Sequence, residues 1–266
     1  MNLNNDNYYS READMEYMSV SQFKSFVGSY GRQGCEFETM EKLAGRWEEE
    51  TTTPMLIGSY VDSFIEGKDA FKKFCMDHLD LYKADGTLKA TYAIGETVIK
   101  RITRDDYFMW NLSGEKQTIM TGEIGGAKWK IKMDSYLPGN RIVDLKVVKD
   151  LTEHHYVRDL GYIDFIDYWG YDTQGAVYQE IVRQNTGEKL PFFIAGVSKE
   201  KYPAMQVIGI SQAKLDEALT RVQVMMPRIL DVKSGRVPPD RCERCDCCRD
   251  TAVLTNWIPQ DMLLAI

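Results

Sequence analysis

A segment of alternating residues, followed by a turn and a second strand-like segment, constrains the fold of this chain more than any other feature. In Lys128–Met133, charged and apolar residues alternate with the period of a half-buried β-strand. Pro138, Gly139 and Asn140 then supply residues that are typical of a turn, and Arg141–Val148 continues as a second strand. We therefore predict a β-hairpin in which residues 141–148 form the partner strand of residues 128–133.

Three charged residues lie at the ends of these strands. Asp134 follows the first strand, while Asp144 and Lys146 share one face of the second because strand side chains alternate. Two neighbouring carboxylates repel each other unless a cation lies between them, and oxygen ligands suit Mg²⁺ or Mn²⁺. A metal there would lower the pKa of a bound water, which the lysine could orient or deprotonate. Asp-x-Lys alone is common at solvated strand ends, but apolar Ile142 and Val143 place Asp144 where a buried strand emerges.

The rest of the pattern indicates helices around a sheet. Ser19-Val20-Ser21-Gln22 has the form of a capping box and predicts the start of a helix. Further helices are expected over residues 37–47, 55–64, 171–184 and 215–232, and short strands over residues 191–197 and 207–211. This order predicts an α/β (α+β) fold with a mixed central β-sheet flanked by helices.

We predict one domain over residues 18–250, between an N-terminal tail of residues 1–17 and a C-terminal tail of residues 251–266. Its helical part would span residues 18–110, and its catalytic core with a cysteine-rich closure would span residues 111–250. The sequence holds no apolar run long enough to span a bilayer and no secretory signal at its start, so we predict a cytoplasmic protein.

The formal charge of −7 argues at first against a nucleic-acid partner, because phosphate binding normally requires a basic surface. The distribution of charge matters more than the total. Residues 124–149 hold six basic and two acidic side chains around the two aspartates. Lys128, Lys130 and Lys132 are therefore candidates for binding DNA.

Four segments of the chain follow one another in a recognisable order. They are Met18–Phe23, Gly58–Asp62, the strands with Asp134, Asp144 and Lys146, and Tyr171-x-x-Gln174-x-x-x-Tyr178. Together they resemble the PD-(D/E)XK nucleases, specifically the RecB-like and RecE-like phage exonuclease branch. That branch usually has a histidine where this chain has Asp62, and an aspartate can also bind a metal.

The resemblance implies a restriction-endonuclease-like core and a deoxyribonuclease that depends on Mg²⁺ or Mn²⁺. The implied metal ligands are Asp62, Asp134, Asp144 and the backbone carbonyl of Leu145. The implied catalytic set is Asp134, Asp144, Lys146, Gln174 and Tyr178. Tyr171 would contact DNA together with the three lysines of the first strand.

The activity implied by the resemblance is exonucleolytic hydrolysis of phosphodiester bonds, with 5′ to 3′ resection of double-stranded DNA ends during phage-type recombination in a bacterial host cell. Such enzymes are similar to rings of identical subunits and work with a single-strand annealing protein. A basic channel inside a ring would reconcile the net negative charge with DNA binding. The alternatives are a single-strand-directed CRISPR-type or repair nuclease, and a non-catalytic DNA-binding adaptor with a nuclease fold.

Six cysteines in a cytoplasmic chain are expected to be thiols or metal ligands and not disulfides. Cys242, Cys245 and Cys248 have a spacing that lets thiolates on a tight loop reach one metal centre, and with Cys247 they could supply four ligands to zinc. Some RecB-like nucleases instead use one N-terminal and three C-terminal cysteines around a 4Fe-4S cluster, which would add Cys35. An iron-sulfur cluster, zinc and unligated thiols are the three alternatives.

Overall fold

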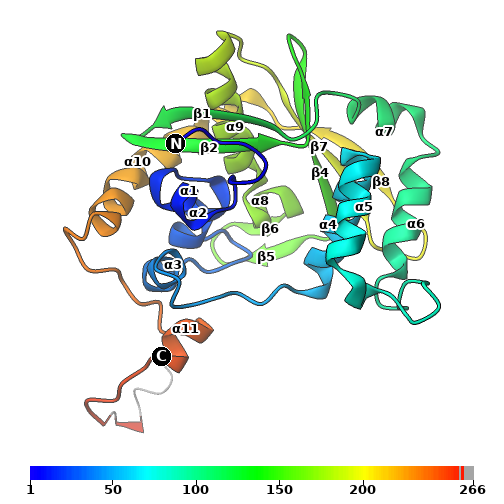
Figure 1. The fold of residues 1–266 in the computed structure, drawn as a ribbon. Helices are drawn as coiled ribbons and strands as arrows, with labels where there is room; N and C mark the ends of the chain where they lie inside the picture. The colour runs from blue at the N-terminus through cyan, green and yellow to red at the C-terminus, as the bar shows by residue number, and fades with distance from the viewer. Residues whose placement is uncertain (258, 261–266) are drawn as a thin grey trace.

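The computed structural model describes residues 1–257 and 259–260, and a four-stranded sheet lies at its centre (Figure 1). The strand order is β3 (Ser135–Leu137), β4 (Arg141–Val148), β7 (Phe192–Ser198) and β8 (Met205–Gly209). β4 and β7 run parallel, whereas the two outer pairs are antiparallel. The prediction of an α+β fold with a mixed central sheet flanked by helices is confirmed.

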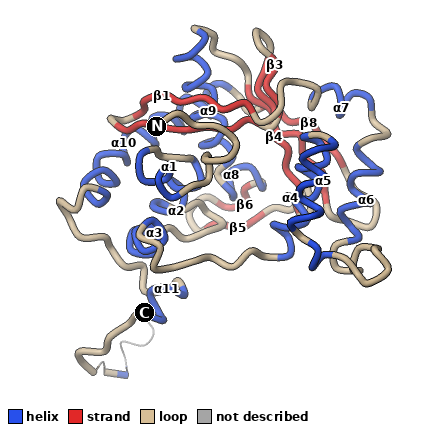
Figure 2. Tube along the Cα trace, in the orientation of Figure 1, coloured by secondary structure: helices blue, strands red, loops and turns tan. Residues whose placement is uncertain are grey.

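Helices cover both faces of this sheet (Figure 2). One face packs against α4 (Thr53–Glu66), α5 (Lys68–Asp77), α6 (Ala93–Ile102) and α7 (Asp106–Asn111), with a 3-10 turn at Leu79–Leu81. The other face packs against α2 (Val20–Val27), α3 (Glu36–Leu43), α9 (Tyr171–Thr186) and α10 (Gln212–Lys233). The helix expected over residues 37–47 ends early, at Leu43.

The side chains of β4 divide between two hydrophobic cores because successive residues of a strand point to opposite faces. Val143 and Leu145 are buried with the helices α4, α6 and α7. Ile142 is buried with α9 and α10 on the opposite face. Asp144 and Lys146 follow the alternation of Ile142 and therefore face α9.

The strand β2 (Ala127–Met133) does not pair with β4. It pairs antiparallel with β1 (Thr118–Ile124), and only the short β3 forms the hairpin with β4 across the predicted turn. The predicted pairing of residues 128–133 with residues 141–148 is therefore wrong. The chain bends at Asp134 between β2 and β3. A carboxylate oxygen of Asp134 accepts the Leu145 N–H at 2.8 Å, a bond that a backbone carbonyl of a neighbouring strand would otherwise accept.

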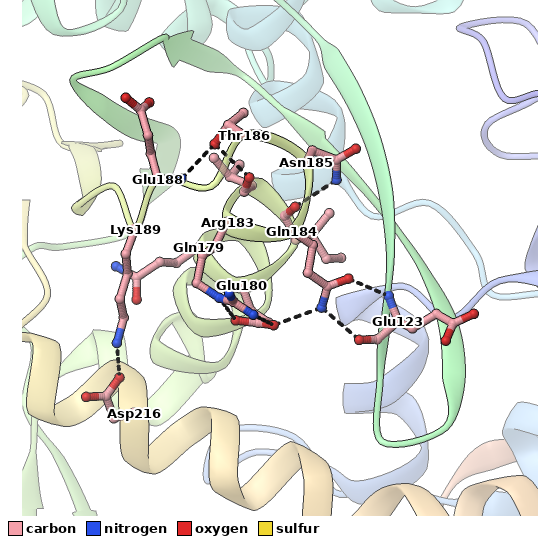
Figure 3. A network of polar contacts seen from close by, with 12 residues as sticks. Glu123, Gln179, Glu180, Arg183, Gln184, Asn185, Thr186, Glu188, Lys189 and Asp216 are labelled. Atoms are coloured by element: carbon pink, nitrogen blue, oxygen red, sulfur yellow. Dashed lines mark hydrogen bonds and ion pairs between the residues drawn. The ribbon is translucent and has the colours of Figure 1, made fainter.

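Polar side chains of α9 hold the separate β1–β2 ribbon in place (Figure 3). The Gln184 side-chain amide accepts the backbone N–H of Glu123 at 2.9 Å and donates to the Glu123 carbonyl at 2.8 Å. Asn185 donates to the carbonyl of Thr121 in the same strand at 2.9 Å. Just beyond the C-terminal end of α9, Lys189 pairs with Asp216 of α10 at 2.8 Å. α9 is thereby fixed to the ribbon and to α10.

The first 17 residues, expected as a tail, contain the helix α1 (Arg11–Glu16) and pack on β2. Met18 N–H donates to the Lys128 carbonyl, and Lys130 N–H donates to the Met18 carbonyl, both at 2.8 Å. Tyr8 and Tyr17 are buried by this contact. The N-terminal segment therefore covers a strand face that alternation alone would leave in water.

Two small elements complete the chain. A hairpin of β5 (His155–Val157) and β6 (Gly161–Ile163) leads into α8 (Phe165–Trp169), and α11 (Asp246–Asp250) packs on α3. Residues 258 and 261–266 of the expected C-terminal tail lie outside the described residues. Within the described part of the chain, no helix has the length and apolar character needed to cross a membrane.

Candidate active site

Asp144 and Lys146 form the centre of the site on β4. Asp144 is buried, and its Oδ2 atom lies 2.5 Å from the Lys146 Nζ atom. The two side chains meet because residues two apart on a strand share a face. Gln174 of α9 donates from Nε2 to the other carboxylate oxygen of Asp144 at 2.6 Å. Both oxygens of Asp144 therefore have a fixed position.

Asp134 reaches the same place from the bend between β2 and β3. Its Oδ2 atom accepts the Leu145 N–H, which shows that this edge of β4 is turned toward Asp134. The N–H and C=O groups of one strand residue point to the same side, so the Leu145 carbonyl faces this edge as well. Tyr178 of α9 donates to the Lys132 carbonyl at 3.0 Å and so fixes the end of β2 beside Asp134.

Asp62 extends from α4 toward this pair of aspartates. Its Oδ1 atom is buried and accepts no hydrogen bond from the described residues. Burial raises the pKa of Asp62 well above its usual range, and the negative charge of Asp134 raises it further. Asp144 is buried, and Asp62 and Asp134 are half-buried beside it. Three converging carboxyl groups fit a site for a hard divalent cation.

The same crowding acts on the other members of the site. Burial and the charge of Asp144 raise the pKa of Asp134 to about 7. For Lys146, burial lowers the pKa, but the charges of Asp144, Tyr171 and Asp134 outweigh it and raise the pKa above its usual value. The carboxylates around Lys146 therefore favour its charged form, in line with its ion pair to Asp144.

The three lysines that were expected to bind DNA lie in three different environments. Lys130 is buried, pairs with Asp14 at 2.7 Å and donates to the Tyr8 carbonyl, so its ammonium group is not presented to solvent. Lys128 is exposed and pairs with Glu16 at 3.1 Å. Lys132 is half-buried beneath the rings of Tyr8 and Tyr9.

Tyr171, the fourth expected DNA contact, lies beside Lys146. Its ring centroid is 5.0 Å from the Lys146 Nζ atom and 5.4 Å from the Lys24 Nζ atom. Lys24, on α2, also donates to the Trp169 carbonyl at 3.1 Å. Burial and the charge of Lys146 lower the pKa of Lys24 to about 8.

Lys24 and Tyr9 are site residues that the sequence did not reveal. Both line a cavity of about 740 Å³, and Tyr171 and Trp169 line it as well. No local spacing marks Lys24, because α2 meets α9 only in the folded chain. Tyr9 lies in the expected N-terminal tail, where the Tyr8-Tyr9 pair was the one available signal.

A second site brings together Cys35, at the N-terminus of α3, with Cys242, Cys245 and Cys248. Their four Sγ atoms all lie within 4.8 Å of one another, and Cys35 and Cys248 are 3.6 Å apart. Backbone N–H groups of Glu38, Cys245 and Cys248 point at three of the sulfurs. Cys247 is buried outside the group.

The spacing of these sulfurs bears on which metal they suit. Four thiolates around one tetrahedral zinc, with Zn–S bonds of about 2.3 Å, have sulfurs about 3.8 Å apart. Thiolates of a 4Fe-4S cluster lie further apart, because each binds a different corner of the cube. The observed separations, 4.8 Å at most, are closer to the spacing around one tetrahedral ion than to that around a cube.

The three aspartates, Lys146 and the four clustered cysteines fall within a region shared with known proteins. Residues 19–251 match the model of a PDDEXK-like domain of unknown function, DUF3799. The chain is also similar to a candidate exonuclease from Eubacterium rectale known from a crystal structure, with 56% identity, a TM-score of 0.96 and full coverage of both chains. No curated protein of similar sequence was found. The chain belongs to the DUF3799 family of PDDEXK-like domains.

Proposed function

We propose that this protein is a nuclease that hydrolyses DNA phosphodiester bonds with the help of a divalent metal. The observation that supports the proposal most strongly is the convergence of Asp134, Asp144 and Lys146 at one edge of β4. A protein that only bound DNA would gain nothing from three converging carboxyl groups beside a lysine. The similarity to a candidate exonuclease agrees with this proposal.

Each side chain has a distinct part in the proposed reaction. Asp62, Asp134 and Asp144, with the Leu145 carbonyl, would hold Mg²⁺ or Mn²⁺, which when bound stabilises phosphate charge and lowers the pKa of water. Lys146 places a permanent positive charge where negative charge develops on the scissile phosphate. Gln174 keeps the Asp144 carboxylate in one orientation.

We further propose that the enzyme is an exonuclease that resects double-stranded ends 5′ to 3′ and leaves a 3′ single strand. The Eubacterium rectale protein supports the exonuclease class. The other parts of this proposal rest on the resemblance to RecE-like enzymes. They are the strand polarity, a ring of subunits, a single-strand annealing partner, a phage or prophage gene, and action in the cytoplasm of the bacterial host. Trp169, Tyr171 and Lys24 line a cavity beside the site that could receive a DNA end.

The experiment that tests this proposal follows the digestion of three substrates in Mg²⁺. Duplex DNA labelled at its 5′ end, the same duplex labelled at its 3′ end, and the labelled single strand are compared over time. Resection 5′ to 3′ predicts early release of mononucleotide from the 5′ label and late loss of the 3′ label. Rapid digestion of the single strand alone would favour a CRISPR-type or repair nuclease, and no digestion would favour a non-catalytic adaptor.

For the cysteine centre we propose a single zinc ion. The support is the mutual separation of the four Sγ atoms, which suits one tetrahedral ion better than a four-iron cube. Metal analysis of freshly purified protein should find about one zinc per chain and no visible absorption. Iron together with a brown colour and absorption near 400 nm would show an iron-sulfur cluster instead.

A further inference from the structure

The hairpin of β5 and β6 displays two tyrosine rings that the described chain leaves uncovered. Tyr156 and Tyr162 are directly opposed partners, with ring centroids 5.6 Å apart, and are 69% and 75% exposed. The neighbouring residue His155 points the other way and stacks on Tyr168 of α8 at 3.6 Å. One face of the hairpin therefore holds it to α8, and the other presents aromatic rings to solvent.

This hairpin is joined to the active site at both ends. Its first strand follows β4, which carries Asp144 and Lys146, and its second strand leads through α8 to Tyr171. Figure 2 shows β5 and β6 beside α8, and in this view they lie between α3 and α4. The stacked pair of His155 and Tyr168 fixes the base of the hairpin three residues before Tyr171, the first residue of α9.

The exposure of the rings needs an explanation beyond hairpin stability. An opposed pair of aromatic residues does stabilise a two-stranded hairpin, which is marginal by itself. That role does not require the outer faces of both rings to stay in water. Arg158, in the exposed turn, forms no ion pair with any residue that the structure describes. Open aromatic faces beside a free cation suit the bases and phosphates of a single nucleic-acid strand.

We propose that Tyr156 and Tyr162 stack on unpaired nucleobases of a DNA strand that lies at the active site. This inference rests on the proposed nuclease function and adds to it the binding of a single-stranded segment. Stacking tolerates any base sequence, because every base has an aromatic face. The hairpin would thus hold a frayed or single-stranded end beside Lys146 without sequence preference.

The test compares the wild type with the double variant Tyr156→Ala and Tyr162→Ala. Affinity is measured by fluorescence anisotropy with a fluorescein-labelled single strand and with the same sequence as a blunt duplex, using Ca²⁺ in place of Mg²⁺ to prevent cleavage. The double alanine variant should bind the single strand at least about tenfold more weakly than the wild type does. Its affinity for the blunt duplex should fall by less. The double phenylalanine variant should bind like the wild type, because stacking needs only the ring.

The matched control is Tyr107→Ala, which removes a tyrosine that is 64% exposed on α7. It should leave both affinities unchanged. Single-strand affinity of the double alanine variant within about twofold of the wild type would overturn the inference. A double alanine variant that becomes monomeric in light scattering, yet binds the single strand normally, would make the hairpin an interface between subunits and also overturn it. If the wild type neither binds nor cuts DNA, the proposed function itself fails.

Discussion

At the scale of single residues, Asp144 is the most constrained side chain of the site. Lys146 holds one carboxylate oxygen at 2.5 Å, and Gln174 holds the other at 2.6 Å. The charge of Asp144 in turn raises the pKa of both Lys146 and Asp134. A change at any of these positions therefore alters the charge or the orientation of its neighbours.

The first prediction concerns Lys146→Ala. We expect hydrolysis to slow at least about 100-fold, because the variant loses the positive charge that would stabilise the negative charge developing on the phosphate. Asp144 and Asp134 remain in the variant. Single-turnover digestion of labelled duplex measures this rate. Lys149→Ala, which removes an exposed lysine just beyond β4, is the control and should keep the wild-type rate. Equal rates for the two variants would remove Lys146 from the mechanism.

A second prediction separates Lys130 from its neighbour Lys128. Lys130→Ala should lower the melting temperature, since it leaves the Tyr8 carbonyl and Asp14 without their buried partner, at a cost of about 2 kcal/mol. DNA affinity should not change. Lys128→Ala should leave stability unchanged, because its pair with Glu16 is exposed. Reduced DNA affinity in a fully stable Lys130→Ala protein would contradict this reading of the structure.

How far the sequence predicts individual residues depends on the distance over which they interact. Asp144 and Lys146 could be placed together because two positions on one strand share a face. The burial of Lys130 could not be predicted, because the covering residues Tyr8 and Asp14 are more than 100 positions away. Lys24 was missed for the same reason, since its partners Tyr171 and Lys146 lie on other elements.

At the scale of elements, the sequence pattern predicts one long hairpin over residues 128–148. The bend at Asp134 divides it into two separate strand pairings. Residues 128–133 do form a strand, but their partner is β1, which the alternation did not mark. The Pro138–Asn140 turn connects β3 to β4 as predicted. Strand existence is thus a local property, whereas strand pairing is decided by tertiary contacts such as those between Gln184 and Glu123.

The cysteine centre joins two elements that are over 200 positions apart, α3 and α11. Cys245→Ser should lower both the metal content and the melting temperature, because loss of one ligand opens a site whose binding energy supports the fold. Cys247→Ser is the control within the same segment, since Cys247 is buried but outside the group. It should retain the metal in elemental analysis. Metal loss in Cys247→Ser with full metal in Cys245→Ser would refute the ligand set.

At the scale of the whole molecule, the net charge of −7 coexists with a basic region around the site. Lys24, Lys132 and Lys146 lie close to the aspartates, and Lys128 remains exposed on β2. We expect DNA affinity to fall steeply as salt rises from about 50 to 200 mM, because phosphate contacts release counterions. Binding measured by anisotropy in Ca²⁺ across this range tests the point. Affinity independent of salt would show that these lysines do not contact phosphates.

In the proposed function, the carboxyl cluster uses a divalent metal to hydrolyse DNA. The most direct measurement is the initial rate of duplex digestion by the wild type and by Asp144→Asn, each with Mg²⁺ and with excess EDTA. Asparagine can still accept the Gln174 hydrogen bond, so the variant tests the charge of Asp144 and not the fold. We expect the wild type to be active in Mg²⁺ and inactive in EDTA, and Asp144→Asn to be slower in Mg²⁺ by at least about 100-fold. Undiminished digestion by the wild type in EDTA, or by Asp144→Asn in Mg²⁺, would contradict it.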